Sequence, residues 1–244
     1  ERPQKLDRAI RSVLAQNHPD LTLHLLLSGP NARDQHRGLE HLTRSTPNLK
    51  TYISRKRFTA AQARNYLMDR AGPGTLAFLD SDDAWQPDHL ATFLNQMPKQ
   101  TQHSILYTAP YIQRQSGATI TPNGAAPSLG SLTKQPLLIS SLILLNPPKS
   151  LRFRNTTAED FLFFADAIGQ MEHWIMADHP TVTYDQENWA RKTLGFKIKR
   201  TYSAFERLLK SHPKALFYIS FFSAHYLRRR LLSTSTKRSP GQAG

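Results

Sequence analysis

The sequence predicts an α/β fold, in which an open and mostly parallel sheet is flanked by helices. Short apolar runs alternate with amphipathic segments, turn residues separate them, and 244 residues are enough for a large hydrophobic core. Ligands of such sheets bind beyond the carboxyl ends of the strands. The residues that follow each apolar run are therefore the first candidates for a functional site.

The first half of the chain alternates between helices and strands. A helix is predicted where apolar residues recur at helical spacing, and a strand where a short apolar run is bounded by turn residues. Gly72, Pro73 and Gly74 end one helix, and Pro87 suits the first turn of another. The helices are predicted over residues 6–16, 33–44, 60–70 and 87–96, and the strands over 21–27, 49–53 and 76–79, the first and last of them buried.

The second half is less regular and shows no internal repeat. A continuous apolar run predicts a strand over 137–145. A helix is predicted over 159–168, with two acidic residues in its first turn, and a short strand over 180–184. These elements continue the same α/β pattern.

The composition excludes several classes of protein. The chain is 39% apolar and 20% charged, which argues against global disorder. It contains no cysteine, which excludes a disulfide scaffold, a thiolate metal site and a cysteine nucleophile. A reducing, cytoplasmic compartment is therefore expected.

The net charge of +14 is concentrated at the C-terminal end. Residues 191–244 contain 13 Lys or Arg and a single acid, Glu206, which gives a net charge of +12. A nucleic-acid-binding protein would carry a basic face on the fold itself, so nucleic acid is not expected as a partner. We predict a basic, helical tail over 201–244, whose aromatic residues and arginines suit an anionic membrane surface. A helix packed on the domain, with its arginines in water, explains the same pattern.

The strongest chemical signal is a run of three carboxylates, Asp80, Asp82 and Asp83, directly after a predicted buried strand. Like charges this close repel one another, so a partner of opposite charge is expected. Mg²⁺ or Mn²⁺, held by one or two carboxylates and by substrate phosphates, would offset the repulsion. A solvated acidic turn or helix N-terminus is the plainer explanation. The position after a buried strand, with Trp85 behind it, favours the metal site.

Several segments together resemble the family-2 glycosyltransferases of the GT-A fold. The resemblance extends from about residue 6 to residue 184, with the segments in the right order. The DSDD and ARN segments are specific in combination, whereas the later segments are weak alone. The matching segments are LDRAIRSVLAQNHPDLTLHLLL, AAQARNYLMDRAGPGTLAFLDSDDAWQPDHL, SLILL and AEDFLFF. The resemblance implies a GT-A-like fold and the transfer of a sugar from a nucleotide-diphosphate donor.

The resemblance also implies roles for individual residues. Asp80 and Asp82 match the carboxylates that hold a divalent metal on the donor diphosphate, and Asp83 completes the metal set. The first of these carboxylates also tends to contact the ribose. Arg64 and Asn65 match a helix that flanks the nucleotide, so both are expected to bind substrate.

The Glu159–Asp160 pair matches the catalytic position of the family. Asp160 is expected to act as the general base that takes a proton from an acceptor hydroxyl, with Glu159 beside it. Ordinary helix N-terminal charge is the better explanation of the pair when the pair is considered alone. Its place downstream of the DSDD segment favours the base.

Two features depart from the family pattern. The family opens with a strand and a turn that lines the nucleotide base, whereas here the first predicted helix follows Glu1 directly. The family's second strand ends in an acidic turn, where this chain has Ser28 and Gly29, so Ser28 is the candidate donor contact there. Trp189 and Arg191 lie where the family has a loop that closes over the diphosphate, so both are candidates there, and a polar linker is the alternative. Three explanations stay open: a truncated start, a donor held differently, or a degenerate relative.

The resemblance thus implies a metal-dependent, inverting transferase that acts on a hydroxyl of a saccharide or lipid-linked acceptor, as in polysaccharide or glycolipid biosynthesis. We expect a nucleotide-sugar-binding half over 1–100, an acceptor-binding half over 101–200 and the tail over 201–244. The protein is expected in the cytoplasm, attached peripherally to the inner face of the membrane through that tail. The alternative is a non-catalytic protein that keeps the fold for binding or membrane association.

Overall fold

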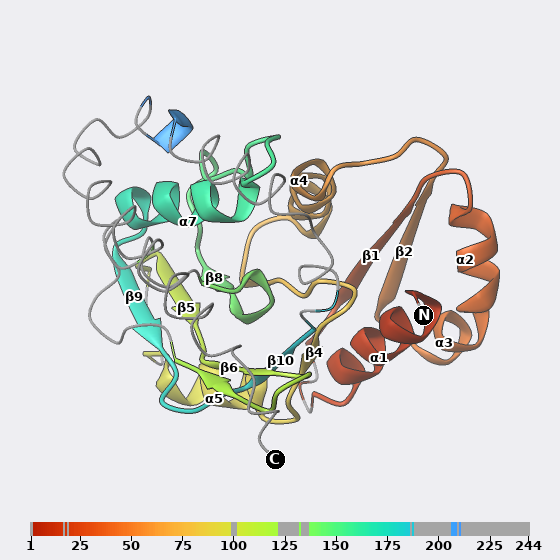
Figure 1. Ribbon diagram of the computed structural model, residues 1–244, viewed down its shortest axis with the longest axis horizontal. Coiled ribbons are helices and arrows are strands. Elements are labelled where there is room, and N and C mark those ends of the chain that lie inside the picture. The colour runs from red at the N-terminus through yellow and green to blue at the C-terminus, as the bar shows by residue number, and fades with distance from the viewer. Residues whose placement is uncertain are drawn as a thin grey trace, which may run out of the picture.

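Helices and strands alternate along the chain, and the strands form three small sheets (Figure 1). The computed structural model describes residues 2–16, 18, 20–98, 102–121, 132, 137–185, 187, 206–208 and 210. The helices are α1 (Arg2–Leu14), α2 (Ala32–Gly38), α3 (Glu40–Ser45), α4 (Ala60–Ala71), α5 (His89–Gln96) and α7 (Glu159–Gln170), with a 3₁₀ turn η1 (Ile139–Ser141). The strands are β1 (Leu23–Ser28), β2 (Leu49–Ser54), β3 (Leu76–Ala77), β4 (Ala84–Trp85), β5 (Ile105–Thr108), β6 (Tyr111–Gln113), β7 (Thr119–Ile120), β8 (Ile143–Leu145), β9 (His173–Met176) and β10 (Val182–Tyr184).

The sheets combine parallel and antiparallel pairs. The first is the parallel pair β1-β2, with Leu23 opposite Leu49. The second has the order β3-β8-β5-β9 and the third the order β4-β10-β6-β7. Among the described strands, three pairs are parallel and four are antiparallel, so the ladders are mixed within the expected α/β architecture.

The largest core cluster lies between α7 and the β3-β8-β5-β9 sheet. Leu162, Phe163 and Phe164 of α7 are fully buried and pack in one cluster with Leu106 and Leu144 of the sheet. Each such side chain contributes about 1.5–3 kcal/mol through burial. This packing fixes the start of α7, and with it the Glu159–Asp160 pair.

Two predicted elements differ in the structure. The helix expected over 33–44 is divided into α2 and α3 at Leu39, a buried residue that packs with Leu42 in the cluster around β1. The strand expected over 137–145 is reduced to β8, because Ser140 and Ser141 form the turn η1 instead. Both serines are fully buried, and Ser140 accepts hydrogen bonds from the backbone N–H of Asp80 and from the indole N–H of Trp85.

The burial expected for two strands is also wrong in part. In β1, Leu25 and Leu26 are only half-buried, and Ala77 of β3 is exposed. Each of these strands has a paired neighbour on one side only within the described residues. An apolar run with a single neighbouring strand keeps part of its surface accessible.

Helix α4 is tied to the segment that precedes α7. Thr59 and Gln62 form a capping box at its start, and Gly72, with a φ of 78°, ends it. The Asn65 side chain donates to the carbonyl oxygen of Phe153 (2.8 Å) and accepts from its backbone N–H (2.9 Å). Because Phe153 stacks on Phe163 at 3.9 Å between ring centroids, this amide joins α4 to the core under α7.

The amide of Asn65 therefore stabilises the fold. We predict that Asn65→Ala lowers the free energy of unfolding by about 2 kcal/mol or more, because it leaves both backbone groups of the buried Phe153 without these partners. Urea unfolding followed by circular dichroism measures the change. The matched control is Asn95→Ala, at an exposed position of α5, where a change within about 0.5 kcal/mol is expected. Equal losses in the two variants would contradict the role of Asn65.

Candidate functional site

The ends of several elements that are distant in sequence meet at one edge of the fold. The Ser28 hydroxyl at the end of β1 accepts a hydrogen bond from the backbone N–H of Phe58 (3.4 Å), just before α4. Thr59, the N-cap of α4, donates to the Asn155 side chain (2.7 Å), just before α7. The strand β3 ends nearby, and its following loop contains the three carboxylates. This is the edge at which ligands of α/β sheets bind.

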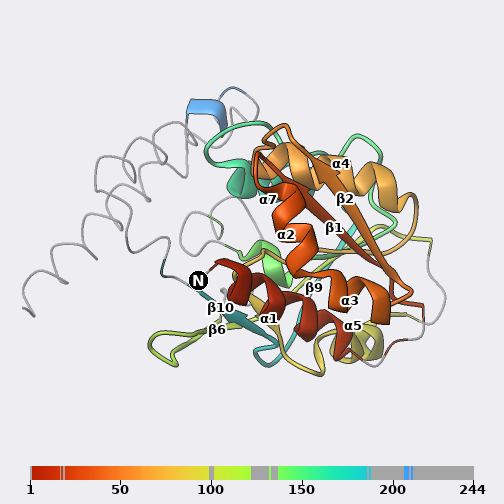
Figure 2. The ribbon, with the colours of Figure 1, turned by 90° about the vertical axis from the view of Figure 1, so that its right-hand side faces the viewer.

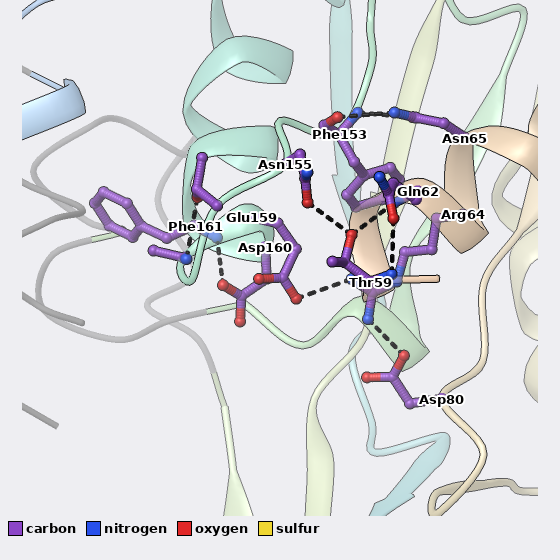
Figure 3. Close-up of polar contacts among 12 residues, drawn as sticks. Thr59, Gln62, Arg64, Asn65, Asp80, Phe153, Asn155, Glu159, Asp160 and Phe161 are labelled. Atoms are coloured by element: carbon purple, nitrogen blue, oxygen red, sulfur yellow. Dashed lines mark hydrogen bonds and ion pairs between the residues drawn. The ribbon is translucent and has the colours of Figure 1, made fainter. Parts of the chain in front are cut away.

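Arg64 lies at the centre of this edge. Its guanidinium donates to Oδ1 of Asp80 (2.6 Å) and to Oε1 of Glu159 (3.3 Å), and Figure 3 shows it between the two carboxylates. The side chain is 13% exposed and its guanidinium carbon lies 5.1 Å from the centre of the Phe153 ring. Burial alone would lower the pKa of Arg64, but the charges of Asp80, Glu159 and Asp160 outweigh it and raise the pKa. The Arg64 guanidinium therefore stays positively charged, and it links the acidic loop to α7.

Asp80 and Asp82 both keep accessible surface. The Asp80 side chain is 39% exposed, and the backbone N–H of Asp80 donates to the Ser140 hydroxyl (3.0 Å). Asp82 is half-buried, and its carbonyl oxygen accepts a hydrogen bond from Arg8 of α1. The loop is thus held through its backbone, while these two carboxylates lie at the surface of the site.

Asp83 has a different environment. It is fully buried, and its two carboxylate oxygens accept hydrogen bonds from the Ser140 hydroxyl and from the backbone N–H of Asp185 (2.9 Å). Burial raises the pKa of Asp83 to about 8, with the neighbouring Asp80 and Asp82 charges acting in the same direction. The structure therefore places Asp83 among protein hydrogen-bond donors, where it joins the acidic loop to η1 and to the end of β10.

The donor set of Asp80 and Asp82 fits a hard divalent cation. No group of three or more His, Asp or Glu side chains within the described residues is arranged to hold a metal ion. Mg²⁺, however, is commonly bound by one or two carboxylates together with substrate phosphates and water. Two accessible carboxylates at a strand end are consistent with a cation that arrives with its ligand.

Asp160 and Glu159 begin α7 on the far side of Arg64. Oδ1 of Asp160 accepts from the backbone N–H of Phe161 (2.8 Å), and the side chain is half-buried. Glu159 is ion-paired with Arg64, whereas Asp160 contributes to the site through its charge beside that pair. The structure thus brings together Asp80, Arg64, Glu159 and Asp160.

Of the four remaining candidates, two have contacts of their own and two cannot be placed. The Asn65 side chain is directed at the backbone of Phe153, and Ser28 lies at the end of β1 beside Phe58. Trp189 and Arg191 lie outside the described residues.

Sequence reasoning missed three residues that support the site. Ser140 holds both Asp80 and Asp83, as described above. Arg8 of α1 contacts the acidic loop and also Asp185 (3.4 Å), whose carboxylate pairs with Lys5 (3.2 Å). Burial would raise the pKa of Asp185, but hydrogen bonds from the Glu187 backbone, Lys5 and Gln115 outweigh it and lower the pKa. The available signal was the position of Asp185, directly after a predicted strand.

Comparison with solved structures shows the same architecture in known transferases. S. aureus TarS 1–349 in complex with UDP-GlcNAc matches with a TM-score of 0.62 and 16% identity over 85% of this chain and 64% of that one. The mannosyltransferase PcManGT from Pyrobaculum calidifontis, in complex with GDP-Man and Mn²⁺, matches with a TM-score of 0.59 and 14% identity over 98% of this chain and 73% of that one. This chain thus spans less than two thirds of the length of the TarS 1–349 chain. At these identities the likeness establishes the fold, which is GT-A.

Comparison at the level of sequence gives the family. No curated protein matches the chain. The family model described as glycosyl transferase family 2 matches residues 1–157, which is more than half of the 244 residues and includes α1, α4 and the acidic loop. With the carboxylates and Arg64 arranged as described, the chain belongs to glycosyl transferase family 2.

Proposed function

We propose that the protein transfers a sugar from a nucleotide-diphosphate donor to a hydroxyl acceptor, with a divalent cation and with inversion at the anomeric carbon. The observation that carries this proposal is the Arg64 bridge. The guanidinium of Arg64 contacts both Asp80, a proposed ligand of the divalent cation, and Glu159, the neighbour of the proposed base Asp160. The sequence indicated both groups but not that a single arginine joins them. Family membership and the nucleotide-sugar complexes of the two similar structures support the same reaction.

The donor half of the proposed site is formed by the acidic loop. Asp80 and Asp82 would hold Mg²⁺ or Mn²⁺, which when bound supplies positive charge to the leaving diphosphate. Arg64 keeps Asp80 oriented, and Arg8 holds the loop backbone at Asp82. Asp83, although predicted as a metal ligand, is better suited to anchor the loop because both of its oxygens accept protein hydrogen bonds.

The acceptor half is formed by the start of α7. Asp160 would take the proton from an acceptor hydroxyl as that oxygen bonds to the anomeric carbon and the bond to the diphosphate oxygen breaks. Attack from the side opposite the leaving group inverts the configuration. Because Glu159 is held by Arg64, it is suited to fix the start of α7, which leaves Asp160 as the base.

A second candidate function is binding without transfer. The observation that favours it is the end of β1, where Ser28 offers a hydroxyl that already contacts Phe58 and where Gly29, with a φ of 112°, provides no side chain. A family member with a weakened donor site could serve as a binding or membrane-associated module.

Membrane attachment and the acceptor remain proposals drawn from the sequence. No helix in the described part of the chain is both long and apolar enough to cross a membrane. Most of the predicted tail, 201–244, lies outside the described residues, as does the boundary at residue 200 between the proposed acceptor half and the tail. The net charge of +12 over 191–244 supports peripheral attachment to an anionic surface, and a saccharide or lipid-linked acceptor would suit that location.

The cation assignment can be tested at Asp82. We predict that Asp82→Asn weakens Mn²⁺-dependent binding of UDP or GDP by at least tenfold, because one of two carboxylates at the cation is lost. Titration calorimetry with and without Mn²⁺ measures the affinity. Asp34→Asn, at an exposed ion pair of α2, is the matched control and should bind as the unmodified chain does. Unchanged Mn²⁺-nucleotide affinity in Asp82→Asn would overturn the assignment.

The base assignment can be tested at Asp160. We predict that Asp160→Asn retains donor binding and lowers the rate of transfer by about 10²-fold or more, the range expected for a lost general base. Screening UDP-, GDP- and dTDP-sugars with Mn²⁺ identifies the donor, and nucleotide release measures the rate. Retained nucleotide affinity separates this effect from damage to the fold. Transfer at the unmodified rate would place the base elsewhere.

The tail assignment can be tested by flotation. We predict that the full chain floats with vesicles containing anionic lipid and that removal of residues 214–244 releases it. Arg228, Arg229 and Arg230 together would contribute about 3 kcal/mol at low salt, and high salt should weaken the binding. Vesicles of neutral lipid are the control. If the full chain stays with the soluble fraction, or if the truncation unfolds the domain, the tail belongs to the core.

A further inference from the structure

Three consecutive basic residues, Arg55, Lys56 and Arg57, form a turn between β2 and α4 that the proposed function does not use. All three are exposed, and within the described part of the chain none of them is ion-paired with an acidic side chain. The wider segment 41–68 contains six Lys or Arg and no Asp or Glu, whereas residues 1–190 as a whole contain 19 Lys or Arg and 17 Asp or Glu. This basic turn is therefore a local concentration of positive charge on the folded domain.

The backbone of the basic turn is held in place by hydrogen bonds. The Ser54 hydroxyl donates to the carbonyl oxygen of Lys56 (3.3 Å) and accepts from the backbone N–H of the same residue (3.2 Å). On one side of the turn, the carbonyl oxygen of Ser54 accepts from the backbone N–H of Gly29 (2.9 Å). On the other side, the backbone N–H of Phe58 donates to the Ser28 hydroxyl (3.4 Å). The three basic side chains are thus presented by a backbone that is tied to the end of β1.

The basic turn lies at the edge of the fold that contains the candidate site. Figures 1 and 2 show the segment from β2 to α4 beside the segment from β1 to α2. A Cβ atom at Gly29 would lie 3.4 Å from the Cγ of Arg57, so the stem of Arg57 runs close to the end of β1. The turn leads into Thr59, the N-cap of α4, which contacts Asn155 just before α7. A surface that covered the turn would therefore also face the start of α4.

An exposed apolar side chain precedes the basic turn. Two large apolar side chains among the described residues are exposed, Ile53 of β2 (44%) and Leu94 of α5 (45%). Ile53 is two residues before Arg55. Basic groups beside an exposed apolar side chain suit the interface of an anionic bilayer, where the cations contact headgroup phosphates and the apolar group reaches the acyl boundary.

Two other kinds of anionic partner fit this surface less well. Single-stranded nucleic acid binds by stacking its bases on aromatic side chains. Tyr52 of β2 and Tyr66 of α4 contact each other at 5.7 Å between ring centroids, and Arg70 lies over both rings, so these aromatic faces are already engaged. A small anionic ligand is bound in a concave site that encloses most of it, whereas the three basic side chains of the turn are all exposed.

We propose that the basic turn and Ile53 form a docking surface for an anionic lipid bilayer on the folded domain itself. The tail proposed above would attach the chain to the membrane, and this second surface fixes which edge of the domain faces it. For the proposed transferase, the orientation presents the edge that contains Arg64 to a lipid-linked acceptor. That consequence rests on the proposed function, but the docking does not.

A fluorescent probe on the full chain tests the orientation. The chain has no cysteine, so a single introduced thiol can be labelled with an environment-sensitive nitrobenzoxadiazole dye. The test position is Ile53→Cys, and the control is Asn95→Cys, which is exposed, follows Leu94 and lies on α5 at the opposite side of the molecule (Figures 1 and 2). With vesicles of phosphatidylglycerol and phosphatidylcholine in equal parts, we expect a blue-shifted and stronger emission from the dye at position 53 only. Because both labelled chains keep the tail, the difference between them reports orientation rather than attachment.

Charge-matched variants test the contribution of the basic turn to affinity. Each basic residue near an anionic surface changes the affinity about fivefold, so Arg55→Gln with Arg57→Gln should weaken vesicle binding at least tenfold and abolish the emission shift at position 53. The control pair, Arg114→Gln with Lys149→Gln, removes the same charge from exposed positions on other segments and should change the affinity less than twofold. Sedimentation with the same vesicles measures the affinity, and circular dichroism checks that all variants are folded.

Three results would overturn the proposal. The first is an emission shift at position 95 that equals or exceeds the shift at position 53, which would mean that the turn does not face the bilayer. The second is an equal loss of affinity in the two charge-matched pairs. The third is an emission shift at position 53 with a single-stranded oligonucleotide and none with vesicles, which would identify a soluble polyanion as the partner. All three are measured without sugar donor or acceptor, so they are independent of the proposed transferase activity.

Discussion

The arrangement of the site depends on the buried, positively charged side chain of Arg64. Arg64 is positioned by α4, contacts the Phe153 ring, and shares its guanidinium between Asp80 and Glu159. Removing one partner of a buried ion pair leaves the other charge without compensation. The resulting loss of stability is larger than the stability that the intact pair contributes. The two carboxylates come from segments 79 residues apart, so without Arg64 they would repel each other across the site. The positive charge of the guanidinium allows Asp80 and Glu159 to lie close together in the folded protein.

A second set of contacts, made by Ser140 of η1, holds the acidic loop in place. Ser140 accepts from the backbone of Asp80, donates to Asp83, and provides the carbonyl oxygen that accepts the indole N–H of Trp85 at 2.7 Å. The loop is therefore fixed at three points, while Asp80 and Asp82 keep their accessible surface. A backbone held in place, with its carboxylates accessible, favours the binding of a charged ligand, because the loop does not have to reorganise when the ligand binds.

The sequence predicted the architecture well and the site in part. Hydrophobic periodicity located α1, α4 and α5 within a few residues but merged α2 and α3 into one helix, and it placed the carboxylates after a strand, where the structure has them. The turn η1 was missed because apolar runs do not reveal which serine is needed as a hydrogen-bond donor. The separate role of Asp83 was missed because three adjacent carboxylates look equivalent in a sequence, whereas burial divides them. Ser140, Arg8 and Asp185 reach the site through tertiary contacts, which have no local pattern.

The contacts that define the site also determine when it can exist during folding. Arg64 and Glu159 are 95 residues apart, and Asp83 and the backbone of Asp185 are 102 apart. Contacts of such separation must overcome the entropy of closing long loops and form after local structure. During synthesis, α4 and the acidic loop leave the ribosome long before α7 and β10 do. Until synthesis has passed Asp185, the chain therefore carries the carboxylates without the groups that hold them in place.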